Sequence, residues 1–211
     1  MKKASPETTI DIFLSNLYFY IELLNKIYTA KYIVSTSEEK EIIFESLLLR
    51  IHAHWETFIE DILIDCLNRD TSKYVEYTGF KLPKHVSRDL CSAILIGTKY
   101  LDFRSVGEVK KLANNILVDS YNPFKTISKT VAGKIDDFTK LRNYLSHQSF
   151  AAERTLMKMY KSRYKLQSFR SPGNFLLVWD KRTNQTRFGN YIDAFLEATD
   201  QIAKFLDVDI S

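Results

Sequence analysis

The sequence predicts an all-α protein, an antiparallel helix bundle built on a long two-helix hairpin. Glycine and proline are scarce, with 6 and 4 among 211 residues, so long segments carry no helix breaker. Apolar residues recur in these segments with the i, i+3, i+4, i+7 spacing of amphipathic helices. A hydrophobic content of 45%, with 13% aromatic residues, is enough for one substantial core. We therefore expect a single domain over 1–211, with its core at about 6–165, a basic loop or hairpin at 165–189 and a C-terminal helix at about 190–206.

The first two predicted helices are the longest elements. The first runs from about Pro6, in the first turn where proline is tolerated, to about Tyr32. The second begins with Ser37 as its predicted N-cap, because the acidic residues that follow suit the positive end of a helix. It continues to about Asn68. At about 1.5 Å per residue each helix is on the order of 40 Å long, which favours an antiparallel hairpin that spans the domain.

Shorter elements follow in the second half of the chain. Helices are predicted at about 84–96, 105–119, 132–147 and 150–164, before the C-terminal helix. The connection from Asp70 to Pro83 is rich in turn residues, and no helix is predicted there. The apolar run 175–179 is predicted as a strand, and a return through 186–188 would complete a small β-hairpin near 175–188.

The net charge is only +4, but the charged residues are unevenly distributed. The segment 36–65 has eight acidic residues against two basic ones, whereas 158–187 has eight basic residues against one acidic residue. Aromatic residues are interleaved with the cations of the second segment, a mixture that suits contact with an RNA backbone and stacking on bases. The expected RNA-binding residues are Lys158, Lys161, Arg163, Lys165, Arg170, Lys181, Arg182 and Arg187. The alternative is a solvated loop.

Several classes of protein and site are not expected. No stretch approaches the roughly 20 uncharged apolar residues needed to span a bilayer, and Asp11 interrupts the first apolar run. We therefore expect a cytoplasmic protein without a membrane partner. Cys66 and Cys91 stand singly, without the spacing of a metal site, and we interpret both as reduced, small apolar residues. Neither a metal nor a cofactor is expected.

A polar residue interrupts the apolar stripe of one predicted helix. Ile135, Phe138 and Leu145 form this stripe, and Arg142 falls on it. A guanidinium beside a core is costly unless a carboxylate, a phosphate or water meets it. The helix ends with the residues Arg-Asn-Tyr-Leu-Ser-His at 142–147. The position therefore indicates an ionic partner for Arg142.

This segment resembles the motif of a known superfamily. Arg142, directly followed by Asn143, and His147 match the Arg-x4-6-His motif of the HEPN superfamily of ribonucleases and related toxins. The pair Trp55-Glu56 on the second predicted helix is similar to the RiboL-PSP HEPN subgroup, in which an acidic or polar residue faces the motif. The chain is therefore identified as resembling this subgroup.

The resemblance covers about 10–165 in architecture and implies both a fold and an activity. It implies a homodimer that cleaves RNA without a metal, acting as a toxin or an anti-phage defence effector beside a cognate antitoxin or sensor protein. A toxin subgroup whose partner modifies a tyrosine carries that tyrosine two residues after the histidine. Ser149 stands there in this chain, so that form of regulation is not implied.

These residue types suit RNA cleavage in which the ribose 2′-hydroxyl is the nucleophile. His147 can serve as base or acid near neutral pH, and Arg142 can stabilise the developing charge on the phosphate. Asn143 can orient the imidazole or the phosphate, and Glu56 can hold Arg142 when RNA is absent. Arg142 and His147 are five residues, or about 140°, apart on a helix, so one chain does not easily aim both at one atom. The resemblance implies that two chains face each other across a cleft.

Other interpretations stay open at this point. Arg142 could form a purely structural salt bridge, His147 could be stabilised by a helix C-terminus, and Glu56 could be a solvated charge. His52 and His54 lie on different sides of their helix, which argues against a metal pair and favours structural roles, although His52 shares a face with Glu56. The alternative functions are a catalytically inactive HEPN-like dimer that binds RNA or protein, and a helical adaptor.

Overall fold

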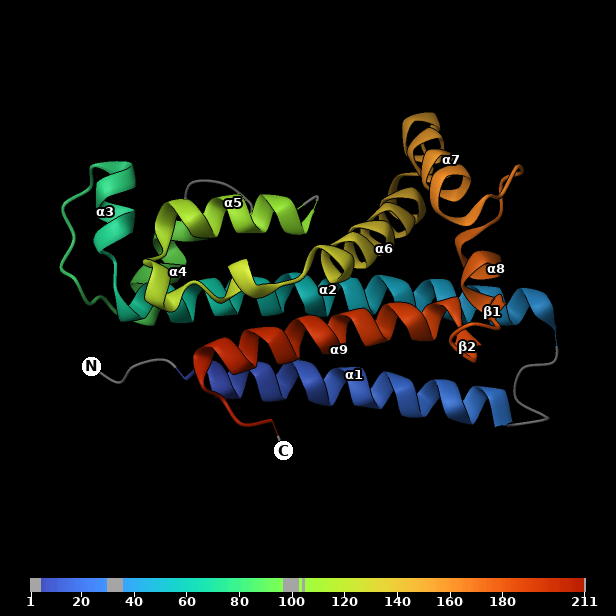
Figure 1. The fold of residues 1–211 in the computed structure, drawn as a ribbon, viewed down its shortest axis with the longest axis horizontal. Helices are drawn as coiled ribbons and strands as arrows, with labels where there is room; N and C mark the ends of the chain where they lie inside the picture. The colour runs from blue at the N-terminus through green and yellow to red at the C-terminus, as the bar shows by residue number, and fades with distance from the viewer. Residues whose placement is uncertain (1–4, 30–35, 97–102, 104, 211) are drawn as a thin grey trace.

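Four long helices form the centre of the computed structural model, which describes residues 5–29, 36–96, 103 and 105–210. They are α1 (Pro6–Thr29), α2 (Ser37–Arg69), α6 (Lys129–His147) and α9 (Arg187–Leu206). Both α1 and α6 pack against α2 and α9, so the four helices form a closed ring. Neighbours in the ring run in opposite directions (Figure 1). The expected all-α class and the antiparallel bundle are confirmed.

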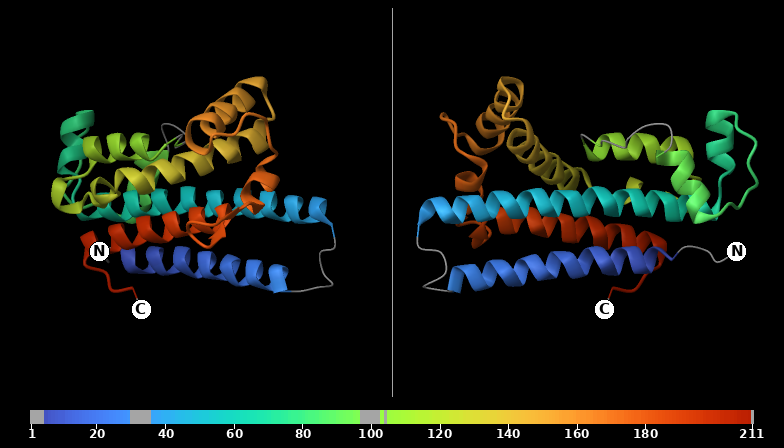
Figure 2. Two further views of the ribbon diagram at one scale, coloured as in Figure 1. Left: turned by 45° about the vertical axis from the view of Figure 1, so that its right-hand side comes forward. Right: turned by 180° about the vertical axis from the view of Figure 1, so that it is seen from behind.

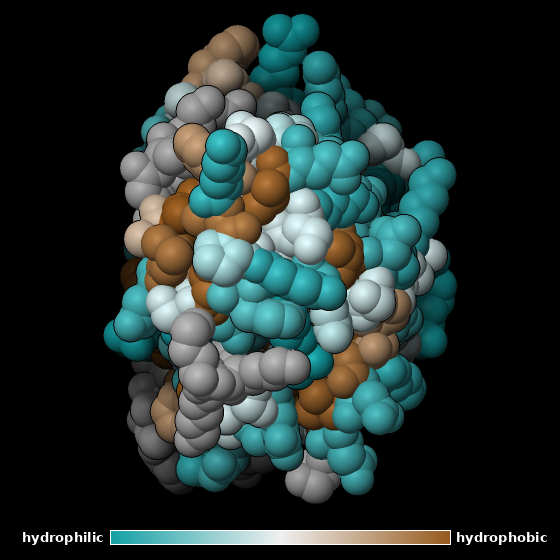
Figure 3. Space-filling model, turned by 90° about the vertical axis from the view of Figure 1, so that its left-hand side faces the viewer, coloured by the Kyte–Doolittle hydropathy of each residue, from teal (hydrophilic) through white to brown (hydrophobic). Residues whose placement is uncertain are grey.

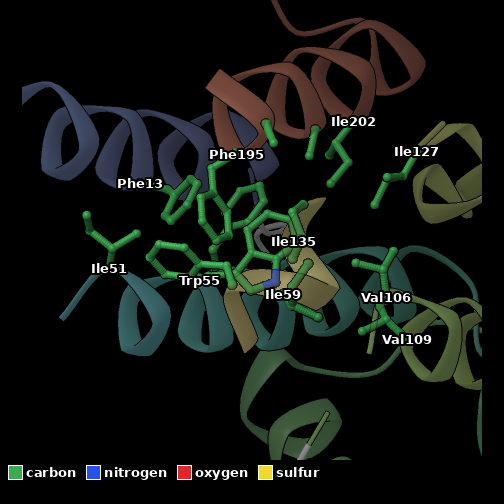
Figure 4. Close-up of a cluster of buried hydrophobic side chains, with 14 of the residues drawn as sticks. Phe13, Ile51, Trp55, Ile59, Val106, Val109, Ile127, Ile135, Phe195 and Ile202 are labelled. Carbon is green, nitrogen blue, oxygen red and sulfur yellow. The ribbon is translucent and has the colours of Figure 1, made fainter. Parts of the chain in front are cut away.

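Aromatic side chains fill the centre of the bundle. Trp55 of α2 lies with its ring centroid 5.7 Å from that of Phe13 and 5.2 Å from that of Phe195, so it joins α1, α2 and α9 (Figure 4). Phe138 of α6 meets Phe195 edge to face at 5.0 Å. Ile135 is 1% exposed and lies in the same cluster. Each such side chain contributes about 1.5–3 kcal/mol when fully buried, and together they fix α6 against α2 and α9.

The start of α2 differs from the prediction by one residue. Thr36, rather than Ser37, is the N-cap, and its hydroxyl accepts a hydrogen bond of 3.1 Å from the Glu39 backbone N–H. The Glu39 carboxylate in turn accepts a hydrogen bond of 3.0 Å from the Thr36 N–H, which completes a capping box. The predicted end of the first helix, at Tyr32, lies outside the described residues.

Smaller elements surround the bundle. They are α3 (Ser72–Thr78), α4 (Arg88–Ile96), α5 (Val106–Ile116), η1 (Asp119–Tyr121), η2 (Pro123–Thr126), α7 (Phe150–Tyr164) and α8 (Pro172–Leu177). The helix predicted at 150–164 is confirmed residue for residue. The prediction of no helix between Asp70 and Pro83 is wrong in part, because α3 forms there. This helix ends at Gly79, whose φ of 74° is the left-handed conformation that favours glycine.

The strand predicted at 175–179 is wrong for most of its length. Ser171 caps α8, and Pro172 occupies the first helical turn, where its missing N–H costs no hydrogen bond. Phe175 packs between Tyr160 and Tyr164, with ring centroids 4.6 and 4.8 Å apart. A short buried helix and a short buried strand have the same apolar pattern, and these contacts favour the helix.

A small β-hairpin follows α8, as predicted. It consists of β1 (Trp179–Asp180) and β2 (Gln185–Thr186), which pair antiparallel with Trp179 opposite Thr186. The helix after it, α9, begins at Arg187, three residues before the predicted start.

The smaller elements gather at opposite ends of the long helices. α7, α8 and the hairpin lie at one end, and α3, α4 and α5 lie toward the other (Figures 1 and 2). The surface at the end that carries α3 has small hydrophobic areas separated by hydrophilic side chains (Figure 3). Within the described residues, none of the helices has the length and apolar character that crossing a membrane requires.

Candidate functional site

The motif helix α6 is capped at both ends. The Ser128 hydroxyl accepts a hydrogen bond from the Val131 N–H at the start. At the end, Gln148 takes a left-handed conformation with φ of 42°, and its N–H donates to the Tyr144 carbonyl at 2.7 Å. This cap ends α6 at His147, whose side chain is exposed and makes no hydrogen bond or ion pair within the described residues. The imidazole is therefore accessible to a ligand.

Arg142 meets a carboxylate from α2. Its side chain is 24% exposed, and Nη2 lies 3.4 and 3.5 Å from the two carboxylate oxygens of Glu56. Nη1 donates to the Asn143 Oδ1 at 3.1 Å. The expected contact between Glu56 and Arg142 is confirmed. The Asn143 amide oxygen therefore contacts the guanidinium, and no hydrogen bond joins Asn143 to His147 within the described residues.

A buried histidine lies behind Glu56. His52 is 1% exposed, and its Nε2 lies 3.1 Å from the Thr139 hydroxyl of α6. Its Nδ1 lies 3.5 Å from a Glu56 carboxylate oxygen, one helical turn further along α2. A bare nitrogen lone pair facing a carboxylate would be repelled, so this geometry favours a proton on Nδ1. His52 thus supports Glu56, and the i, i+4 spacing of the two residues was the signal in the sequence.

These contacts keep Glu56 ionised. Burial raises the pKa of the Glu56 carboxyl, but the close contact with His52 and the charge of Arg142 outweigh burial. The pKa of Glu56 therefore lies below its ordinary value, and its negative charge balances Arg142 at neutral pH. We call the group Glu56, Arg142, Asn143 and His147, with His52 behind it, the Arg142 centre.

The structure divides the basic residues of 158–187 into groups. Lys158, Lys161 and Arg163 line a shallow hollow of about 630 Å³ along α7, together with Lys140. Arg163, Lys165, Lys181, Arg182 and Arg187 line a second pocket of about 370 Å³ between α7, the hairpin and α9. Arg170 is exposed, and its carbonyl accepts a hydrogen bond from the Tyr160 hydroxyl.

None of the residues that line these two hollows belongs to the Arg142 centre. Near the end of the motif helix, the ring of Tyr144 lies 5.1 Å from that of Phe169, which belongs to the basic segment. The sequence therefore anticipated the cationic residues but not their grouping into separate hollows.

The cysteines are consistent with the reduced, apolar role expected of them. Cys66 and Cys91 are both free and buried. Burial raises the pKa of the Cys66 thiol to about 12 and that of the Cys91 thiol to about 11, so both stay protonated at neutral pH. Within the described residues, no three His, Cys, Asp or Glu side chains are grouped as a metal site would need.

Comparison with known proteins places this geometry in a family. The RiboL-PSP-HEPN family model matches residues 15–169, which is more than half of the chain and includes the whole Arg142 centre. No match was found among curated proteins or among solved structures. The helical bundle, the motif at the end of α6 and this match agree, and the chain belongs to the RiboL-PSP HEPN family.

Proposed function

We propose that this protein is a metal-independent endoribonuclease of the HEPN type. The observation that carries the proposal is the Arg142 centre, in which Glu56 and Asn143 hold a half-buried guanidinium five residues before an exposed imidazole. A fixed cation and a titratable group are the two elements that 2′-hydroxyl chemistry requires of a protein.

The chemistry begins when a base removes the proton of the ribose 2′-hydroxyl. The 2′-oxygen then attacks the neighbouring phosphorus, and the bond from phosphorus to the 5′-oxygen breaks, leaving a 2′,3′-cyclic phosphate. An acid returns a proton to the departing 5′-oxygen. His147 serves as base or acid, while Arg142 stabilises the additional negative charge on the phosphate oxygens.

RNA must compete with Glu56 for Arg142. The carboxylate contacts Nη2 at 3.4 Å, while Asn143 holds Nη1. When a phosphate arrives, it replaces the carboxylate as the ionic partner, and Asn143 keeps the guanidinium in place. Glu56 therefore acts as a positioning residue that keeps Arg142 paired until substrate binds.

Two copies of the chain complete the proposed site. Arg142 points toward Glu56 of α2, and His147 lies about 140° further round the helix. A homodimer in which the two motifs face each other across a cleft supplies an acid from one protomer and a base from its partner. Sedimentation analysis of the purified protein should therefore report a dimer under the conditions in which it cleaves RNA.

The decisive experiment is cleavage of single-stranded RNA in the presence of EDTA. The wild type should leave 2′,3′-cyclic phosphate ends and should not cut DNA, which lacks the 2′-hydroxyl. His147→Ala should slow cleavage by about 10²–10⁴-fold, the usual contribution of a general acid or base. His85→Ala is the matched control, because His85 is also exposed but lies far along the sequence from the motif.

A cleavage rate that His147→Ala leaves unchanged would contradict the proposal. Circular dichroism and sedimentation of each variant establish that it is folded and has the same oligomeric state as the wild type. The control His85→Ala should match the wild type in all three measurements.

The biological role we propose is that of a toxin or an anti-phage defence effector in the cytoplasm, held in check by a cognate antitoxin or sensor protein. Supporting it is the chemistry itself, since an unrestrained ribonuclease damages its host. Induced expression of the wild type should stop growth, and His147→Ala should not. Lys158, Lys161 and Arg170, with the other cations of 158–187, are the proposed contacts to the RNA backbone.

A catalytically inactive dimer that binds RNA or protein is the second candidate. The observation that favours it is that Glu56 already neutralises Arg142 in the resting chain. Such a dimer would bind RNA in a salt-dependent way without product formation. Binding without cleavage by the wild type, over a range of RNA sequences, would favour this candidate over the nuclease.

A further inference from the structure

A cationic pocket lies between the end of α7, the β-hairpin and the start of α9. Its volume is about 370 Å³, within the range of sites that hold small molecules. An adjoining pocket of about 380 Å³ shares four of its residues. We call the first one the Arg187 pocket; its lining consists of Arg163, Tyr164, Lys165, Trp179, Asp180, Lys181, Arg182 and Arg187. Five of these side chains are cations and one is a carboxylate.

Arg187 is fixed at the inner side of this pocket by aromatic rings. Its guanidinium carbon lies 4.5 Å from the centre of the Phe175 ring and 5.0 Å from that of the Tyr164 ring. The Tyr164 hydroxyl is hydrogen-bonded to the Tyr191 hydroxyl at 2.7 Å, which holds that ring in place. A guanidinium stacked in this way is presented in one orientation, as recognition of an anion by its planar fork requires.

Arg187 forms no ion pair within the described residues; Asp180 of the same pocket attracts its charge but pairs with Arg182. Its side chain is half-buried, and Nη1 donates only a long hydrogen bond of 3.5 Å to the Phe175 carbonyl. No described carboxylate lies within ion-pair distance of it. Burial lowers the pKa of Arg187, yet a guanidinium stays charged at neutral pH. A partly buried cation without a partner is unfavourable, and a bound anion would relieve this cost.

The other cations of the pocket are of two kinds. Arg163 pairs with Asp137 at 3.0 Å, and Arg182 pairs with Asp180 at 3.3 Å. Lys165 donates to the Ser162 carbonyl but has no described carboxylate partner, and Lys181 also forms no ion pair among the described residues. Three cations, including Arg187, are therefore available to one anion.

An aromatic face accompanies these cations. Trp179 lines the same pocket and is 55% exposed, although an indole of this size is usually covered in a folded chain. Indole rings stack on nucleobases of every kind, because each base has a π-face. A cluster of cations beside an exposed indole is complementary to a phosphate joined to a base by a sugar.

We infer that the Arg187 pocket binds a nucleoside phosphate, with Arg187, Lys181 and Lys165 around the phosphate and Trp179 against the base. The site is separate from the Arg142 centre, with which it shares no lining residue. Residues 179–187 of the pocket lie beyond the region that the family model matches, so family membership does not account for it. The phosphate can belong to a free nucleotide or to the phosphorylated end of a strand, which present the same chemistry.

The test measures binding of AMP, UMP, adenosine and inorganic phosphate to the full chain by calorimetry. AMP and UMP should bind saturably. Adenosine, which lacks the phosphate, should bind at least about tenfold more weakly, since a charged hydrogen bond contributes about 1.5–3 kcal/mol. The chain has two tryptophans, and Trp55 is only 5% exposed. Nucleotide should therefore quench the fluorescence of Trp179, and Trp179→Phe should abolish the quenching.

Variants connect this binding to the pocket. Arg187→Gln should weaken AMP binding by about tenfold or more. Because Arg187 packs against two rings, Lys181→Gln in the exposed hairpin is a second variant that leaves the core intact, with an expected loss of about fivefold. Lys111→Gln, an exposed lysine of α5, is the matched control and should bind AMP as the wild type does.

Two results would overturn the inference: no saturable binding of either nucleotide, or equal binding by the wild type, Arg187→Gln and Lys181→Gln. A 5′-phosphorylated DNA tetramer, which cannot be cleaved through a 2′-hydroxyl, distinguishes the sources of the phosphate. Competition with AMP by the phosphorylated tetramer, and not by its 5′-hydroxyl counterpart, would identify the end of a strand. Competition by neither tetramer would identify a free nucleotide as the ligand of the pocket. His147→Ala should bind AMP normally, so failure of the nuclease proposal and failure of this one are distinguishable.

Discussion

The Arg142 centre and the Arg187 pocket each contain a half-buried guanidinium, but among the described residues only Arg142 forms an ion pair. Glu56 meets Arg142 at 3.4 Å, and His52 supports that carboxylate from the core. Arg187 instead stacks on two rings, and no described carboxylate lies within ion-pair distance. In the first region Arg142 pairs with a carboxylate of the protein, whereas in the second Arg187 can pair with a bound anion.

This difference has a chemical meaning. In the proposed nuclease, a phosphate that enters the Arg142 centre has to displace a carboxylate, so we expect low affinity for the resting substrate and the largest benefit in the transition state, where the phosphate carries most charge. At Arg187 nothing has to be displaced, so an anion is bound in its ground state. A catalytic site and a binding site are expected to differ in this way.

The largest expected effect tests whether the two regions are independent. Arg142→Ala should lower the rate of RNA cleavage by about 10²–10³-fold, the usual cost of removing one group that stabilises transition-state charge. Its affinity for AMP, measured by calorimetry, should not change. Arg50→Ala, an exposed cation about 120° around α2 from Glu56, serves as the control. Loss of AMP binding in Arg142→Ala would show that the two regions are a single site.

A second prediction concerns stability. Thr139→Val removes the hydroxyl that meets the Nε2 of buried His52 at 3.1 Å, and an unsatisfied buried polar group costs about 1–3 kcal/mol. Lys181→Gln changes a pocket cation that has no described partner, and should alter the free energy of unfolding by less than about 0.5 kcal/mol. Urea unfolding of both variants measures the contrast. Equal losses of unfolding free energy in the two variants would mean that the polar groups of the Arg142 centre do not stabilise the fold through their contacts with one another.

A third prediction addresses competition between Glu56 and RNA. In a His147→Ala background, which prevents cleavage, Glu56→Gln should raise the affinity for RNA by about two- to fivefold, because the phosphate no longer displaces a charged partner. Fluorescence anisotropy with a labelled RNA measures this change. An unchanged or weaker affinity would show that Glu56 does not compete with the substrate.

The smallest expected effect is a dependence of stability on pH. The pKa of Glu56 lies below its ordinary value of 4.5 in the folded chain. Its ionised form therefore contributes stability above pH 4.5, and this contribution is lost as the pH falls through the lower folded pKa. The difference in free energy of unfolding between the wild type and Glu56→Gln should shrink as the pH is lowered. A difference that grows at low pH would contradict this assignment.

Local signals made much of the fold predictable. The bounds of α7 followed from the uninterrupted apolar pattern of 150–164, and the structure shows that Ser149 caps its first turn. The need of Arg142 for a partner followed from a cation on an apolar stripe, whereas the choice of Glu56 followed from the resemblance of Trp55-Glu56 to the RiboL-PSP HEPN subgroup.

Long-range contacts explain what the sequence did not reveal. The start of α8 is bound by two carboxylates about 130 positions away, because the Ser171 hydroxyl donates to Glu41 at 2.7 Å and the Gly173 N–H donates to Glu45 at 2.9 Å. A Cβ on Gly173 would lie 2.6 Å from the Glu41 carbonyl oxygen. No pattern within 175–179 could indicate these partners, so the strand prediction failed there.

The junction between α6 and α7 has a mechanical consequence. Only Gln148 and Ser149 separate the two helices, and each is fixed by a cap, Gln148 to α6 and Ser149 to α7. His147 therefore lies next to the junction about which α7 would tilt, and α7 has 15 residues and a length of about 22 Å. A tilt of about 5° would shift the far end by roughly 2 Å. Arg163 near that end pairs with Asp137 of α6 at 3.0 Å, so a ligand that bound this arginine would remove one tie between the two helices.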